Sequence, residues 1–154
     1  MSDPDPSLST LSTHDARLAA RMIRLSGAKP DTRLLVAGRG NFDLFLALCR
    51  SGFLHARYET ARGPRDGDDA DILWVRDVAA AGLEGVLAVF GRSLRAGGSL
   101  VADLATVPWG EPLVRLRRVL ADAGFAMLLQ EPQGEGAILL ARKLGPASAA
   151  RQAA

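Results

Sequence analysis

The stretch LLVAGRGNFD, residues 34–43, has the residue types of a loop that binds a nucleotide-like ligand. An apolar run leads into Gly38 and Gly40, and glycine lets the backbone approach a ligand closely and adopt positive φ. Glu59 ends a second candidate strand, where a carboxylate can accept hydrogen bonds from ribose hydroxyls. Asp77 follows a third candidate strand. The candidate ligand-binding residues are therefore Gly38, Arg39, Gly40, Asn41, Glu59 and Asp77.

Several of these residues also have a purely structural interpretation. Glu59 is equally well explained as a solvated carboxylate at a strand end, and Asp77 is more often the cap of the helix that follows it. Asn41 is suited to cap a helix over residues 42–51. In the loop VPWGEP, Trp109 could stack on a ligand, but packing within the loop is the favoured interpretation.

Apolar periodicity predicts the elements that position these residues. Short apolar runs alternate with amphipathic segments, and each predicted helix ends near a glycine. Nearly all-apolar strands separated by helices indicate a parallel sheet covered on both faces. Only PQGE separates the last two strands, which indicates an antiparallel hairpin. The predicted strands are 33–38, 53–59, 71–75, 99–104, 125–131 and 136–143; the predicted helices are 13–26, 42–51, 83–95 and one from Pro112 to the residue before Gly124; residues 60–70 form a loop.

This order of elements resembles the class I S-adenosylmethionine-dependent methyltransferases, whose open sheet has its last strand inserted antiparallel. Three segments carry the resemblance, over roughly residues 33–143: LLVAGRGNF, LEGVLAVFGRSLRAGGSLVADL and LRRVLADAGFAMLLQE. The resemblance implies an α/β fold with an open, mostly parallel sheet, helices on both faces and a C-terminal antiparallel hairpin. It also implies S-adenosylmethionine as the cofactor. A dinucleotide-binding Rossmann domain begins with the same strand, glycine turn and helix, but the closing hairpin argues against it.

Two positions in the glycine loop depart from the family's pattern. Gly38 and Gly40 match its first two glycines, and Glu59 matches the acid of its second strand. Val36 stands where the family has an acid that helps to hold the amino-acid end of the cofactor. Phe42 replaces the third glycine, and its ring could fill space that the ligand would take. Retention and loss of cofactor binding are both compatible with this loop.

The segment between Glu59 and Asp71 is short. The family has a helix, a strand and a second helix here, roughly 30–40 residues, whereas this chain has the eleven residues 60–70. One edge-strand unit, which helps to enclose the adenine, is therefore expected to be missing. Strand 53–59 would then form an edge of the sheet with unpaired backbone groups, and we expect a homodimer through this strand.

Length and composition predict one soluble domain. The 154 residues are expected to form a single domain over 13–144, with disordered segments at 1–12 and 145–154. The single cysteine, Cys49, excludes an intramolecular disulfide and a cysteine-cluster metal site, and no metal site is predicted. No secretory signal or membrane-spanning run is apparent, so we expect a cytoplasmic protein with no membrane partner.

The charge of the chain is a weak guide to its partners. The net charge is +2 and the pI is near 9.2, with nearly all the basic residues being arginine. A nucleic-acid partner is not expected, because the arginine cluster of the last helix is more readily explained as a solvated helix face. The cluster consists of Arg115, Arg117 and Arg118.

Three functions are compatible with these observations. The first is a methyltransferase-like protein that has lost efficient catalysis and serves as a binding or assembly module. The second is an active small S-adenosylmethionine-dependent methyltransferase that acts on a small molecule. The third is an RNA-associated protein. No residue is assigned a catalytic role.

Overall fold

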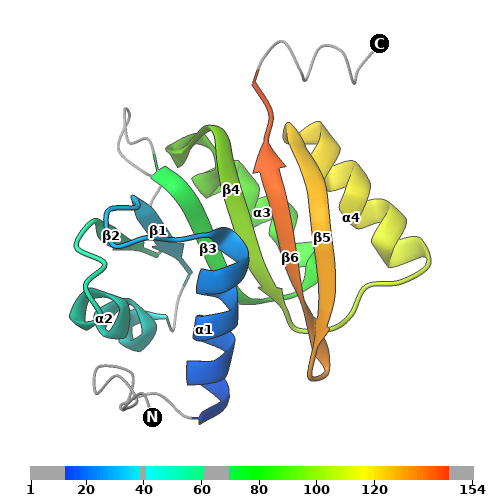
Figure 1. Ribbon diagram of the computed structural model, residues 1–154. Coiled ribbons are helices and arrows are strands. Elements are labelled where there is room, and N and C mark those ends of the chain that lie inside the picture. The colour runs from blue at the N-terminus through cyan, green and yellow to red at the C-terminus, as the bar shows by residue number, and fades with distance from the viewer. Residues whose placement is uncertain (1–12, 39–40, 61–69, 146–154) are drawn as a thin grey trace.

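The described strands form one mixed sheet in the order β2-β1-β3-β4-β6-β5 (Figure 1). The computed structural model describes residues 13–38, 41–60 and 70–145. Strands β2, β1, β3 and β4 run parallel to one another, and β6 lies antiparallel between β4 and β5. The predicted parallel sheet with a closing antiparallel hairpin is confirmed. The strands are β1 (Leu34–Ala37), β2 (Ala56–Glu59), β3 (Ala70–Val78), β4 (Leu94–Leu104), β5 (Phe125–Gln133) and β6 (Gly136–Lys143).

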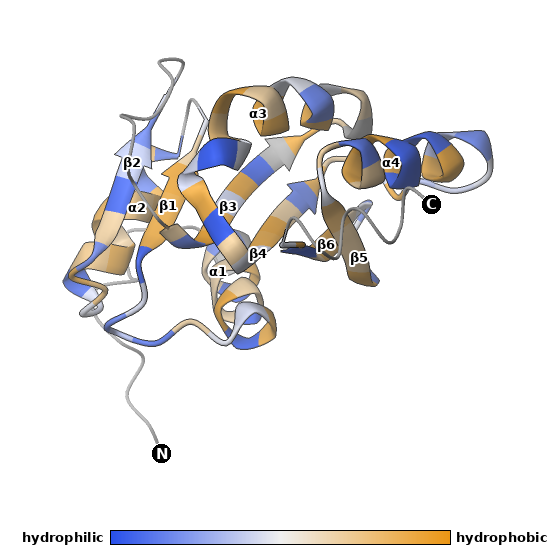
Figure 2. Ribbon diagram, turned by 90° about the horizontal axis from the view of Figure 1, so that it is seen from above, coloured by the Kyte–Doolittle hydropathy of each residue, from blue (hydrophilic) through white to orange (hydrophobic). Residues whose placement is uncertain are grey.

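Helices cover both faces of this sheet, as predicted. Within the described ranges, the α-helices are α1 (Thr13–Ser26), α2 (Phe42–Arg50), α3 (Leu83–Phe90) and α4 (Glu111–Asp122), and short 3-10 turns lie at Ala80–Gly82 and Gly91–Ser93. Figure 2 shows α3 and α4 on one side of the sheet and α1 on the other. Among the described residues, no helix has both the length and the apolar character needed to cross a membrane.

Two apolar cores form because successive residues of a strand point to opposite faces. On the α1 and α2 side, Val36 and Trp74 pack with residues of both helices. On the α3 and α4 side, Leu35 and Leu73 pack with residues of those helices. The nearly all-apolar strands of the sequence are thus explained by burial on both faces.

The helix predicted over 83–95 is shorter in the structure. α3 ends at Phe90, and residues 94–98 belong to the first part of β4. The Nζ group of Lys143 donates to the carbonyl oxygens of Gly91 and Leu94, at 2.8 and 2.6 Å. These two hydrogen bonds link the segment that follows α3 to β6, the last strand. The RAGG sequence therefore lies within a strand and does not end the helix.

The second predicted strand also begins later than expected, at Ala56 and not at residue 53. The backbone N–H groups of Phe53 and Leu54 donate to Leu48 and Gly52 carbonyls, and the Ala56 N–H donates to Phe53. These turn bonds occupy the donors that a strand would use, so pairing with β1 starts only at Ala56. β3 is longer than predicted because, beyond an irregularity after Val75, its pairing with β4 resumes at Val78, which lies beside Leu104.

Two polar clusters tie the sheet to its surroundings. At the N-terminal end of β3, Asp71 accepts hydrogen bonds from the Arg33 backbone N–H at 2.9 Å and from Arg95 Nε at 2.6 Å. Partial burial raises the pKa of Asp71, but the Arg33 and Arg95 contacts outweigh it, so the pKa lies below its ordinary value. On α1, Arg21 donates to Glu131, Gln133 and the Pro132 carbonyl of β5. This arginine fastens the first helix to the terminal hairpin.

On one side the sheet ends at β2. Within the described part of the chain, β1 is the only strand that pairs with β2. This agrees with the prediction that one edge-strand unit is missing. The predicted loop 60–70 lies almost wholly outside the described residues.

Candidate functional site

The candidate ligand residues lie where the parallel strands β1, β2 and β3 end. β1 pairs with β2 and β3 so that Ala37 lies opposite both Glu59 and Val75. The Gly38 N–H donates to the Glu59 carbonyl at 3.0 Å, which brings these two residues side by side. Ligands of open α/β sheets bind at this edge. Arg39 and Gly40 lie outside the described residues, and so does the side chain of Asp77.

One carboxylate oxygen of Glu59 is shielded from solvent and receives no hydrogen bond from the residues that the structure describes. Oε1 lies 3.6 Å from Nη1 of Arg57, and the Glu59 side chain is 22% exposed. Oε2 is buried and has no hydrogen-bond partner among the described residues. A buried carboxylate oxygen without a donor is costly, and native structures normally satisfy it with protein, water or ligand.

The turn after β1 is shaped by Gly38 and Asn41. Gly38 has φ +108°, a conformation that favours glycine, and a Cβ there would lie 3.3 Å from Nδ2 of Asn41. Asn41 is 4% exposed and precedes α2, but its side chain makes no capping bond to the helix. Its Nδ2 donates instead to the Ala37 carbonyl at 3.1 Å. The prediction that Asn41 caps α2 through its side chain is therefore wrong, because that side chain points back to the end of β1.

The two residues that depart from the family's pattern have different surroundings. Val36 is fully buried in the core beneath α1 and α2. Phe42 is 50% exposed and belongs to an aromatic cluster with Phe45 and Tyr58, whose ring centroids are 5.7–6.1 Å apart. Tyr58 was not singled out from the sequence, although its position one residue before Glu59 places it at this end of β2. The cluster covers the sheet next to the Glu59 end of β2.

The ion pair between Arg76, near the end of β3, and Asp15 was not predicted from the sequence. Arg76 Nη2 forms an ion pair with the Asp15 carboxylate of α1. The side chain of Arg76 is 18% exposed, and its Nε is buried with no partner among the described residues. Arg76 directly follows Val75, which pairs with Ala37, the last residue of β1 before the Gly38 turn. No sequence signal relates an aspartate of the first helix to this strand end, because only the fold brings them together.

Trp109 lies in the loop between β4 and α4 and is 79% exposed. The prediction that this side chain packs within the loop is therefore wrong. The loop itself is fixed, since Gln130 Nε2 of β5 donates to the Pro108 carbonyl at 3.2 Å. The arginines of α4 are exposed, as predicted; they are Arg115, Arg117 and Arg118.

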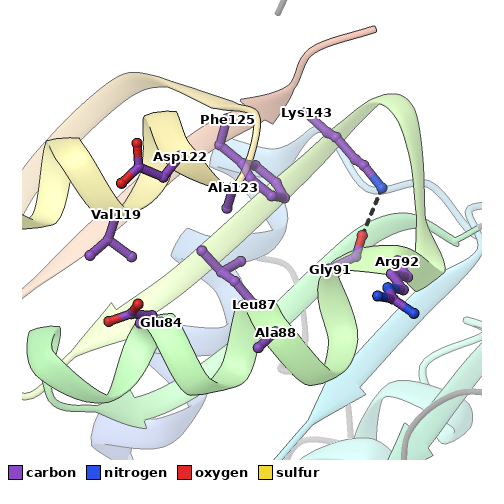
Figure 3. A pocket seen from close by; sticks show the side chains of 10 residues that line it. All are labelled: Glu84, Leu87, Ala88, Gly91, Arg92, Val119, Asp122, Ala123, Phe125 and Lys143. Atoms are coloured by element: carbon purple, nitrogen blue, oxygen red, sulfur yellow. Dashed lines mark hydrogen bonds between the residues drawn. The ribbon is translucent and has the colours of Figure 1, made fainter. Parts of the chain in front are cut away.

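A cavity of about 540 Å³ lies between α3 and α4, away from these strand ends (Figure 3). Leu87, Val119 and Phe125 give it apolar walls. Figure 3 shows Glu84 and Asp122 at one end and Arg92 and Lys143 at the other. Charges of both signs therefore line it. In the described part of the chain, no three histidine, cysteine or acidic residues are grouped as metal ligands.

The chain matches no protein-family model, and no curated protein is similar to it in sequence. Solved structures share its fold. One is a ribosomal protein L11 methylase from Lactobacillus delbrueckii subsp. bulgaricus, with a TM-score of 0.62 and 14% identity over 87% of this chain and 81% of that one. Another is the O-methyltransferase TomG from Streptomyces achromogenes, involved in tomaymycin synthesis and solved in complex with SAM, with a TM-score of 0.56 and 14% identity over 93% and 92% of the two chains.

An O-methyltransferase family protein from Burkholderia thailandensis has a TM-score of 0.55 and 15% identity over 86% of this chain. This chain covers only 59% of that protein, which is less than two thirds of its length. Together these similarities confirm the predicted class I methyltransferase-like fold.

Proposed function

We propose that this chain, which has the fold of the class I methyltransferases, is a binding module for an adenosyl ligand and has lost efficient methyl transfer. One observation carries the proposal. Glu59 Oε2 is buried with no donor in the described part of the chain, at the strand edge where such folds hold their ligand and beside the Gly38 turn. A ribose has two adjacent hydroxyls that can donate to a carboxylate in this position.

The described residues fit one part of S-adenosylmethionine better than the other. Glu59 would hold the ribose hydroxyls, and the backbone at Gly38 would lie against the ligand without an intervening side chain. When bound, S-adenosylmethionine supplies an electrophilic methyl group. Val36, however, offers no charge for the ammonium of the amino-acid end and is fully buried. Loose placement of the reacting end lowers the rate of a reaction that depends on positioning, and this supports binding without efficient catalysis.

An active small methyltransferase is the second candidate, and Arg76 favours it. Its buried Nε–H has no acceptor among the described residues, and Arg76 follows Val75, which pairs with the last residue of β1. A guanidinium is suited to bind a carboxylate. Arg76 could hold the carboxylate of the amino-acid end and compensate for the acid that Val36 replaces.

Calorimetric titration with S-adenosylmethionine and S-adenosylhomocysteine tests the proposal. We expect dissociation constants in roughly the micromolar range. Glu59→Gln should weaken binding by about 10- to 100-fold, the value of hydrogen bonds to a charged group. Glu111→Gln, which changes an exposed acid on α4, is the matched control and should leave binding unchanged. No binding at about 1 mM ligand, or equal binding by Glu59→Gln, would contradict the proposal.

Transfer of a tritiated methyl group to a panel of small molecules separates the two candidates. Binding without turnover supports the binding module. Turnover that is reduced by Arg76→Gln supports the enzyme.

We also propose that two copies associate through β2. Its outer edge has no strand partner among the described residues, and such edges pair readily with another chain. The region proposed is the strand predicted over 53–59, of which Ala56–Glu59 is extended. Light scattering after size exclusion should show a dimer at micromolar concentration. Residues 55 and 59 pair with β1, so the backbone N–H of Tyr58 faces the outer edge. Tyr58→Pro should shift the dimer to monomer because proline removes this donor, whereas Tyr58→Ala should not. A wild-type monomer would refute this association.

A further inference from the structure

A groove of about 580 Å³ runs along the outer edge of β5, between this strand and α4. β5 is the last strand of the sheet on this side, and Figure 1 shows α4 beside it. The groove lies away from the strand ends of β1, β2 and β3, and it adjoins the cavity between α3 and α4 at Phe125, which lines both. Its lining residues are Arg117 and Ala121 of α4 and Phe125, Ala126, Met127, Leu128, Leu129 and Gln130 of β5.

The backbone of β5 is part of this groove. Residues 125–130 line it without interruption, although neighbouring residues of a strand point to opposite faces. A groove lined in this way follows the edge of the strand. β6 is the only strand paired with β5 in the described part of the chain, so the other edge offers backbone donors and acceptors. Leu128, next to the irregular pairing at Met127 and Leu129, is 49% exposed.

The charge of the groove limits which kind of ligand it can bind. Among the described residues that line it, Arg117 carries the one charged side chain, and the other lining side chains are apolar except that of Gln130. The cavity between α3 and α4, by contrast, has two acids and two bases. An occupant of the β5 groove therefore needs apolar groups along most of its length and a negative charge facing Arg117.

Nucleic acid meets these needs poorly, because its phosphates repeat at every nucleotide and require a row of cations. A second copy pairing through its own β5 would bring Arg117 with it and no acid among the groove residues. An extended peptide meets them well. It pairs its backbone with an open strand edge while alternate side chains enter the groove beside a helix.

We propose that the β5–α4 groove binds an extended peptide segment of a partner protein, added to the sheet as a further strand. Six residues of β5 line the groove, which corresponds to a span of about 20 Å. The bound segment presents apolar side chains to Met127 and Leu129 and an acidic side chain to Arg117. This site is independent of the adenosyl ligand proposed above.

Selection from a phage-displayed library of random peptides of about eight residues tests the proposal. Selection on the wild-type chain should enrich apolar sequences that contain an acid. Arg117→Glu should fail to retain the enriched peptides, whereas Arg24→Glu, which changes an exposed arginine of α1, should retain them. Enrichment of no sequence, or equal retention by Arg117→Glu, would overturn the proposal.

A synthetic copy of the strongest peptide then tests strand addition. Fluorescence anisotropy should give a dissociation constant of about 1–100 µM, weakened at least about tenfold by backbone N-methylation at alternate residues, which removes donors and keeps side chains. Hydrogen exchange should slow at β5 amides and not at β2. Equal binding of the methylated peptide would refute strand addition, and stronger binding of an oligouridylate than of the peptide would assign the groove to nucleic acid instead.

Discussion

Replacing Asn41 by aspartate should destabilise the protein, although aspartate is as good a helix N-cap as asparagine. In the structure, the Asn41 side chain makes no bond to the first turn of α2, and its Nδ2 donates to the Ala37 carbonyl at 3.1 Å. A carboxylate cannot donate this bond. It would also place a negative charge beside a carbonyl oxygen at a position that is only 4% exposed.

The expected decrease in the free energy of unfolding follows from the lost hydrogen bond and from the buried group left without a partner. The hydrogen bond contributes about 1 kcal/mol, and a buried polar group left without its partner costs about 1–3 kcal/mol more. We expect Asn41→Asp to lower the free energy of unfolding by about 2–4 kcal/mol and Asn41→Ala by about 1–2 kcal/mol. If the residue acted as a cap, the aspartate variant would equal the wild type, and its charge near the helix N-terminus would even favour it.

Urea unfolding at neutral pH, followed by circular dichroism, measures both variants. Asp43→Asn is the control, because it removes an exposed acid from the same helical turn and should cost only a few tenths of a kcal/mol to about 1 kcal/mol. Lowering the pH to about 4 protonates part of the new carboxylate and restores a donor, so the difference from the wild type should shrink. An Asn41→Asp variant as stable as the wild type at pH 7 would refute the reasoning.

Three further predictions concern stability and exposure. Because folding lowers the pKa of Asp71, its contribution to stability is present above the ordinary carboxyl pKa and is lost as the pH falls through the folded value. In thermal melts, acidification should therefore lower the melting temperature of Asp71→Asn less than that of the wild type. Trp74 is 2% exposed and Trp109 is 79% exposed. In urea unfolding, Trp74→Ala should lower the free energy of unfolding by about 3–5 kcal/mol and Trp109→Ala by under about 0.5 kcal/mol. Acrylamide should quench the fluorescence of Trp109 selectively. A double-mutant cycle on Arg21 and Glu131, whose side chains are 23% and 37% exposed, should give a coupling of about 0.5–1 kcal/mol, and a zero coupling would contradict the fastening of α1 to the hairpin.

The sequence was informative about the fold because the fold depends on apolar periodicity and glycine turns. The first helix has the predicted bounds, Thr13–Ser26, and the terminal strands pair as the short PQGE connection predicts. Element ends were less predictable where distant residues decide them. α3 ends before RAGG, and Lys143, far along the chain, binds the carbonyls of Gly91 and Leu94.

The candidate site was less predictable than the fold. Gly38 and Glu59 could be identified because a turn and a strand end leave local signals in sequence. The burial of Glu59 Oε2 and the pairing of Arg76 with Asp15 depend on side chains brought together by the sheet and by α1. Asn41 has the residue type of a cap, but a nearby strand carbonyl competes for its amide. Residue type alone does not decide that competition.

The position of β6 affects how the protein can be made. It follows every other described strand along the chain, yet it lies inside the sheet between β4 and β5. A ribosome releases the chain from its N-terminus, so β4 and β5 leave the exit tunnel before residues 136–143 can join them. Until then each strand lacks a neighbour, and exposed strand edges promote aggregation. The second half of the sheet therefore closes only after residues 136–143 have emerged, and nascent chains paused before Gly136 expose strand edges that chaperones would have to protect.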